Sequence, residues 1–111
     1  MDKPILTLGD KCIQTHPGKI PVIVYYNHMP NVTNNFLVDN ATTINYLLVL
    51  VRRKNKNTHA DFLCAFIDKI LINNSELVST LYSKHKNVTD GCLRITIVKE
   101  NIFRKKPNKR T

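Results

Sequence analysis

The sequence predicts an α+β fold of the β-grasp class, with one main helix packed across a four-stranded mixed sheet. Two observations lead to this class. The hydrophobic patterns follow the order strand, strand, helix, strand, short helix, strand. The length of 111 residues suits one domain that buries about two-thirds of its unfolded surface. A weaker helical segment precedes these elements.

The first two strands are predicted to form a hairpin. KIPVIVYY at 19–26 and NNFLVD at 34–39 are rich in β-branched and aromatic residues, and the turn-forming NHMPN lies between them. Pro21 has no backbone N–H, so we expect the ladder to be open on one side at that residue. The second strand of the hairpin is expected at an edge of the sheet.

The main helix is expected directly after the hairpin, with Asn40 or Thr43 as its N-cap. Three consecutive cations at 52–54 favour the negative end of the helix dipole, so they predict its carboxyl end. Its apolar face is formed by Ile44, Leu47, Leu48 and Val51.

The remaining elements complete the sheet. FLCAFI at 62–67 is an apolar run typical of a strand covered on both faces. A short helix is predicted at 75–82, capped by Asn74 or Ser75. The last strand, CLRITIV at 92–98, is expected to run parallel to the first at the centre of the sheet. Residues 1–18 are expected to form an N-terminal helical arm, 19–103 the ubiquitin-like domain, and 104–111 a basic disordered tail.

The composition limits the classes of function. A formal charge of +9 favours acidic partners such as nucleic acid, anionic membranes or acidic peptides. The odd cysteine count (Cys12, Cys64 and Cys92) predicts reduced thiols, and no signal-peptide or membrane-spanning run is found, so we expect a soluble cytoplasmic protein. Cys12 and His16 have no second ligand pair, and no nucleophile–base cluster is recognisable. We therefore expect no enzyme activity, metal or cofactor.

Several segments resemble the autophagy ubiquitin-like modifiers of the GABARAP and microtubule-associated light-chain type. They are KIPVIV, FLVDNATTINYLLVLVRRK, DFLCAFIDKILI, LVSTLYSKH and ITIVKENIF, within residues 11–103. The resemblance implies a cytoplasmic, autophagosome-associated adaptor that we expect to be a monomer. Its partners would carry a motif with an aromatic residue followed three positions later by an aliphatic one. The motif would add as an extra strand beside the second strand of the hairpin.

The resemblance also implies the residues that bind the motif. Those of the aromatic pocket are Cys12, Pro21, Ile23, Leu37 and Cys92, those of the aliphatic pocket are Phe36, Val38, Leu47 and Leu50, and the basic contacts are Lys19 and Lys54. Side chains alternate along a strand, so Phe36 and Leu37 must face opposite sides. Ile23, Leu47 and Leu50 could equally be ordinary core residues.

The sequence departs from the family at this groove. Cys92 replaces a usual aromatic residue, Cys12 a common aliphatic, Thr42 a leucine and Asp39 a proline, and 33–35 lack the frequent basic residues. A lost large side chain typically costs about 1–3 kcal/mol, which predicts an affinity about ten- to a hundredfold weaker.

The conjugation site of the family also differs. Arg104 stands where these modifiers have the glycine that is joined to phosphatidylethanolamine, so the chain as written is not expected to be lipidated by that route. The basic tail is either a solvated extension or a weak contact to anionic membrane, at about 1 kcal/mol per cation. A nucleic-acid-binding module is the rival interpretation, with RRKNK at 52–56 and stacking by Tyr25, Tyr26 and Tyr46.

Overall fold

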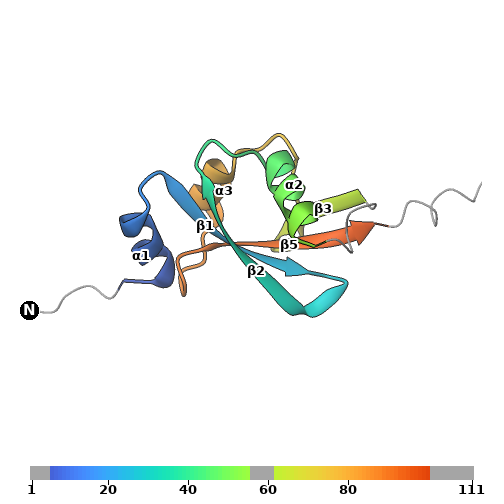
Figure 1. Cartoon of the computed structure of the whole chain (residues 1–111), viewed down its shortest axis with the longest axis horizontal. Helices are drawn as coiled ribbons and strands as arrows, with labels where there is room; N and C mark the ends of the chain where they lie inside the picture. Colours follow the sequence, from blue (N-terminus) through green and yellow to red (C-terminus); the bar gives the residue numbers. More distant parts are fainter. Residues whose placement is uncertain (1–5, 56–61, 101–111) are drawn as a thin grey trace, which may run out of the picture.

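The computed structural model describes residues 6–55 and 62–100. Figure 1 shows two helices on one side of a twisted sheet and a third helix beside the start of the first strand. The elements are α1 (Leu8–Thr15), β1 (Lys19–Tyr26), β2 (Met29–Asp39), α2 (Ile44–Lys54), β3 (Phe62–Ile67), β4 (Ile70–Leu71), α3 (Val78–His85) and β5 (Leu93–Glu100).

The sheet has the order β2-β1-β5-β3-β4, with β1 and β5 parallel at its centre and the other pairs antiparallel. The predicted β-grasp arrangement is therefore confirmed, but the sheet has five strands because Ile70–Leu71 pairs with the end of β3. The predicted second strand was also too short, since β2 begins at Met29. Pairing between β1 and β5 starts at Val22, one residue after Pro21, so the proline lies outside that ladder.

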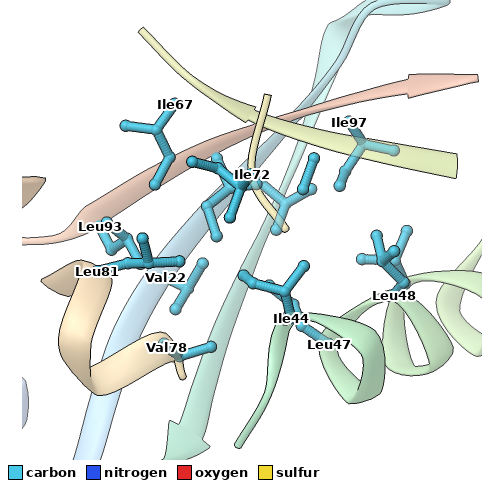
Figure 2. Close-up of a cluster of buried hydrophobic side chains, with 14 of the residues drawn as sticks. Val22, Ile44, Leu47, Leu48, Ile67, Ile72, Val78, Leu81, Leu93 and Ile97 are labelled. Atoms are coloured by element: carbon cyan, nitrogen blue, oxygen red, sulfur yellow. The ribbon is translucent and has the colours of Figure 1, made fainter. Parts of the chain in front are cut away.

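The core lies between the sheet and α2 with α3 (Figure 2). Thr43, one of the two predicted N-caps of α2, accepts a hydrogen bond from the Tyr46 N–H at 3.2 Å. The apolar face predicted for α2 is buried throughout. It packs against residues of the sheet and α3 that include Val22, Val24, Leu63, Ala65, Val78, Leu81, Leu93, Ile95 and Ile97.

The predicted start of the short helix was wrong. The helix begins at Val78, and its N-cap Leu77 makes no side-chain capping bond. Asn73 instead holds a turn, because its Oδ1 accepts from both the N–H and the hydroxyl of Ser75, each at 2.8 Å. The Val78 N–H donates to the Thr42 carbonyl at 2.8 Å, so a distant segment takes the place of a local cap.

The N-terminal helix α1 forms as predicted and begins with a capping box. The Asp10 N–H donates to Thr7 Oγ1 at 3.0 Å, and the Thr7 N–H donates to Asp10 Oδ2 at 3.2 Å. The helix contacts β1. The arm before Leu6 and the predicted basic tail lie outside the described residues.

Candidate functional site

The edge strand β2 offers the first part of the candidate site. It pairs with β1 from Lys19↔Asp39 to Tyr26↔Met29. Within residues 6–55 and 62–100, no strand pairs with its other side. Such an edge presents backbone N–H and C=O groups that an added strand can pair with.

A cavity of ≈ 220 Å³ lies next to this edge. Its lining is almost entirely apolar and consists of Leu8, Cys12, Pro21, Val22, Ile23, Asn35, Phe36, Leu37 and Cys92. All five residues assigned by resemblance to the aromatic pocket are therefore brought together in one cavity. Whether a peptide occupies it stays a prediction.

Strand alternation explains why these side chains meet. Pro21 pairs with Leu37, and Ile23 with Asn35, so their side chains share one face of the sheet. Val22 and Phe36 form the intervening pair, and Val22 belongs to the core on the other face. Leu37 is 38% exposed, so part of this apolar side chain is accessible at the cavity.

Sequence reasoning missed three lining residues, Leu8, Val22 and Asn35, and assigned a fourth, Phe36, to the aliphatic pocket instead. Two of them had a recognisable signal. Leu8 is four residues before Cys12, and hence on the same face of α1. Asn35 is two residues before Leu37, and hence on the same face of β2. No pattern in the sequence predicted that α1 packs against the sheet.

The predicted aliphatic pocket has a different character. Leu47 is 0% exposed and Val38 is 5% exposed, so both belong to the core and have almost no surface for a ligand. Phe36 and Leu50 are partly buried and pack against that core. Of the four residues, only these two combine core contact with accessible surface.

The two predicted basic contacts lie on exposed ends of elements. Lys19 begins β1, and its Nζ is 3.9 Å from Asp39 Oδ2. An exposed pair of this kind contributes little to stability. Lys54 ends α2 after Arg52 and Arg53. These three cations lie together at the carboxyl end of the helix.

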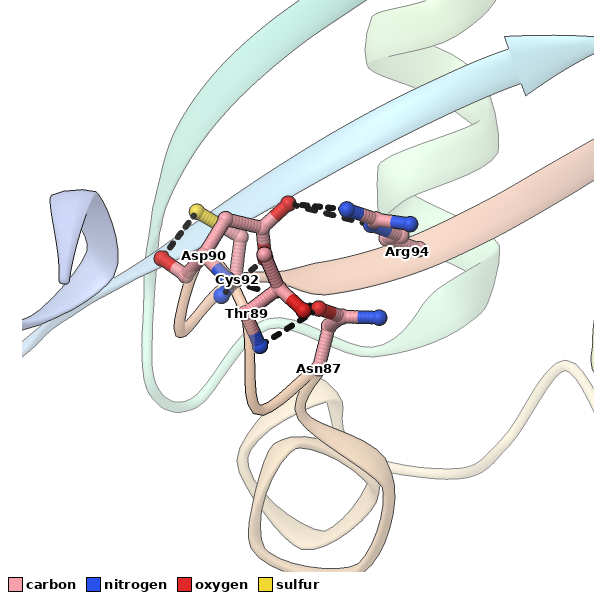
Figure 3. Close-up of polar contacts among 5 residues, drawn as sticks. All are labelled: Asn87, Thr89, Asp90, Cys92 and Arg94. Carbon is pink, nitrogen blue, oxygen red and sulfur yellow. Dashed lines mark hydrogen bonds and ion pairs between the residues drawn. The ribbon is translucent and has the colours of Figure 1, made fainter.

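The loop before β5 forms one wall of the cavity (Figure 3). Asp90 Oδ2 accepts from Arg94 Nε at 3.0 Å and Nη2 at 2.7 Å, and Asp90 Oδ1 accepts from the Cys92 N–H at 3.0 Å. Partial burial opposes ionisation of Asp90, but these hydrogen bonds outweigh it and lower the pKa of the carboxyl. Figure 3 shows the Cys92 sulfur pointing away from Arg94, toward the Asp90 carbonyl.

Helix α1 also lines the cavity and is attached to the same loop. The Gly9 N–H donates to the Asp90 carbonyl at 2.7 Å, and the Tyr82 hydroxyl donates to the Gly91 carbonyl at 3.0 Å. Gly91 has φ +70°, and a Cβ there would lie 2.1 Å from Thr7 Oγ1. Backbone contact between helix and loop thus fixes the width of the cavity.

The tyrosines do not form the stacking surface that a nucleic-acid module needs. Tyr26 is 2% exposed, and its hydroxyl accepts from Asn55 Nδ2 at 2.7 Å, so the prediction that it stacks on bases was wrong. Tyr46 is exposed on α2, whereas Tyr25 lies on the opposite face of the sheet by strand alternation. The two accessible rings therefore cannot act together.

Other kinds of site were also sought in the described part of the chain. No three potential metal ligands among His, Cys, Asp and Glu lie together there. None of the described helices is long and apolar enough to cross a membrane. Cys12, Cys64 and Cys92 are not joined in disulfides.

Known proteins resemble this chain over most of its length. Residues 7–104 match the family model described as autophagy protein Atg8, ubiquitin-like. The chain is 31% identical over 101 residues to autophagy-related protein 8 of Schizosaccharomyces pombe, covering 87% of this chain and 83% of that protein. It is 31% identical over 94 residues to autophagy-related protein 8e of Arabidopsis thaliana, covering 81% and 76%.

A solved structure supports the fold. The crystal structure of Trypanosoma brucei ATG8 superimposes with a TM-score of 0.72 at 20% identity, covering 83% of this chain and 82% of that one. The family model, which matches residues 7–104, and the relatives at 31% identity establish the family. The chain belongs to the Atg8 family of ubiquitin-like autophagy proteins.

Proposed function

We propose that this chain is an adaptor that binds short aromatic-x-x-aliphatic peptide segments of partner proteins by adding them as a strand to β2. The observation that carries the proposal is the position of an apolar cavity directly beside β2, whose outer side pairs with no other strand of the described residues. Backbone pairing along β2 would supply affinity without regard to sequence, and the cavity would select the aromatic side chain.

The size and lining of the cavity support an aromatic occupant. Its walls are apolar apart from Asn35, and fully burying a Phe-sized side chain contributes about 1.5–3 kcal/mol. The aliphatic residue of the motif would contact Phe36 and Leu50, the accessible members of the second group. The Cys92 side chain is smaller than the aromatic residue that is usual in the family, so it would contact a bound side chain less. This supports weaker binding than is usual in the family.

The charge of the chain favours acidic residues beside the motif. Lys19 and Lys54 are exposed, and the cations at 52–54 add to the field of the +9 chain. The partners would be autophagy receptors or machinery, and the adaptor itself a cytoplasmic, autophagosome-associated monomer. Arg104 would not accept the lipid that a glycine accepts, and an Arg104→Gly variant ending there should gain conjugation in a reconstituted lipidation assay.

Titration calorimetry with a synthetic peptide tests the proposal. The peptide carries tryptophan and leucine three positions apart with acidic neighbours, and a double-alanine version is the control ligand. Leu37→Arg should weaken binding at least tenfold, because a charge would enter the apolar cavity. Asn31→Arg is the matched control variant, since this exposed residue lies on the same strand but does not line the cavity.

The outcomes distinguish the adaptor from its rival. Equal weakening by Leu37→Arg and Asn31→Arg would show that an added charge anywhere on β2 weakens binding, and would contradict a specific role of the cavity. Retention on heparin without binding of the tryptophan peptide would favour the nucleic-acid interpretation. Flotation with anionic liposomes, comparing the full chain with residues 1–103, tests the membrane contact expected of the tail.

A further inference from the structure

Two of the three thiols in the chain line the same cavity. Cys12 comes from α1 and Cys92 from the loop that leads into β5, and both are free. Eighty residues of sequence separate them, so only the fold brings them together. The third thiol, Cys64, lies on β3 and does not line this cavity.

The backbones that carry the two thiols are in direct contact. A Cβ on Gly91 would lie 3.4 Å from the Gly9 Cα, which is an ordinary van der Waals distance. Cys92 follows Gly91 directly, and Cys12 lies one helical turn after Gly9 on the same face of α1. The contact thus joins the two segments that carry the cysteines, and Cys12 and Cys92 both line one cavity of ≈ 220 Å³.

We infer that Cys12 and Cys92 are a redox-modification site, at which peroxide joins the two sulfurs in a disulfide that closes the aromatic pocket. The effect on peptides rests on the proposed function, whereas the formation of the disulfide does not. Peptide binding in this cavity would then depend on the oxidation state of the protein.

The chemistry requires one peroxide for each disulfide. The Cys12 sulfur is the first target, because it is half-buried at the cavity wall whereas Cys92 is 2% exposed. Its thiolate displaces hydroxide from hydrogen peroxide, leaving a sulfenic acid, and the hydroxide takes up the thiol proton as water. The Cys92 sulfur then attacks the Cys12 sulfur, and the sulfenic hydroxyl leaves with the Cys92 proton as a second water. Two thiols are oxidised, and the peroxide is reduced to two waters.

The environment of Cys92 fits the second of these roles. Burial, followed by the nearby charge of Asp90, raises the pKa of the Cys92 thiol to about 11, so at neutral pH it is protected from direct oxidation. Its S–H points to the Asp90 carbonyl at 3.6 Å. An adjacent sulfenic acid overcomes this low reactivity, because groups held together react at a high effective concentration.

A disulfide would remove the space that an aromatic ring needs. The two sulfurs would approach to about 2.05 Å and place the bridge inside the cavity. Leu37, Pro21 and Ile23 would remain in place, but the ring could not pass between them and the bridge. We expect the oxidised protein to bind the tryptophan peptide at least tenfold more weakly, and reduction to restore the affinity.

Peroxide treatment of the dilute folded chain, followed by mass spectrometry, tests the site directly. The expected product is a monomer two hydrogens lighter, whose digest contains a cross-linked pair of peptides with Cys12 and Cys92. Cys64→Ser should give the same product, and Cys12→Ser should not. A cross-link that involves Cys64, one between chains, or no cross-link would overturn the inference.

Calorimetry on reduced and oxidised samples of each variant tests whether the disulfide closes the cavity to the peptide. The ratio of the two affinities is compared within one variant, so any effect of the substitution itself cancels. The ratio should be at least ten for the natural sequence and one for Cys12→Ser. Unchanged affinity in a fully cross-linked sample would overturn the closure. If the reduced protein binds no peptide, the proposed function fails, and the cross-link is still decided by its mass.

Discussion

Gly9 and Gly91 are packed so closely that a methyl group on Gly9 would lie 1.9 Å from the Gly91 carbonyl oxygen. Residues 82 positions apart in the sequence therefore meet backbone to backbone. The contact attaches α1 to the loop before β5, and both segments line the cavity beside β2. One glycine pair thus links the stability of the N-terminal helix to the shape of the candidate site.

Gly9→Ala is expected to destabilise the protein, although alanine is the better helix former. Helix propensity alone would add about 1 kcal/mol of stability. The clash is with backbone rather than with a flexible side chain, so α1 must move, at a cost of about 1–3 kcal/mol. Urea unfolding should therefore show a net loss. Gln14→Ala, at an exposed position of the same helix, is the control, and a more stable Gly9→Ala variant would contradict the packing.

A polar network joins the hairpin to the end of α2. Asn55, the C-cap of that helix, donates through Nδ2 to the Tyr26 hydroxyl at 2.7 Å and to Asn34 Oδ1 at 2.9 Å. The Tyr26 hydroxyl in turn donates to Asn34 Oδ1. These bonds connect the edge strand β2 to the helix that covers the core.

Asn55→Ala should lower the free energy of unfolding by about 1–3 kcal/mol, because the Tyr26 hydroxyl would lose its donor in a part-buried position. Tyr26→Phe should have a smaller effect of about 0.5–1.5 kcal/mol, since Asn34 still receives the hydrogen bond from Asn55. Thermal or urea unfolding measures both. The reverse order of the two effects would show that the tyrosine hydroxyl is the main contributor.

Leu47 and Leu50 lie on the same helix and differ in burial, because Leu47 belongs to the core whereas Leu50 is only partly buried. Leu47→Ala should cost about 2–5 kcal/mol, because the side chain is 0% exposed and its removal leaves a cavity. Leu50→Ala should cost about 1 kcal/mol and weaken peptide binding, since Leu50 is only partly buried against the core. Urea unfolding and calorimetry are measured on both variants. Weaker binding by folded Leu47→Ala with unchanged binding by Leu50→Ala would contradict this division.

Much of the fold could be predicted because its signals are local. The β-branched run of β1, the apolar face of α2 and its Thr43 cap each specify their element without help from distant residues. The start of α3 could not be predicted in this way. The residues that resemble caps hold a turn, and the first helical N–H bonds to Thr42 more than thirty positions away.

The candidate site also has one part that the sequence predicts and one part that it does not. The register of the hairpin and strand alternation place Pro21 beside Leu37, so this part follows from the sequence once the strands are recognised. The wall formed by Leu8 and Cys12 does not, because it depends on the long-range contact of Gly9 with Gly91. Glycine in a short helical pattern ordinarily weakens a prediction, whereas here it is the residue that permits docking.

Asp90→Asn tests the electrostatics of the loop before β5. The pKa of Asp90 lies below its ordinary value of 3.8, because hydrogen bonds to the Cys92 N–H and Arg94 outweigh the effect of partial burial. A lowered pKa in the folded state means that the carboxylate contributes stability above about pH 4, and that this contribution is lost as the pH falls through the folded-state pKa. Neutral asparagine should cost about 1–3 kcal/mol at pH 7. The difference from the natural sequence should narrow as the pH falls below about 4 in urea titrations. Asp39→Asn is the control, since Asp39 forms only an exposed pair with Lys19, and a difference that stays constant with pH would exclude the charge of Asp90 as the cause.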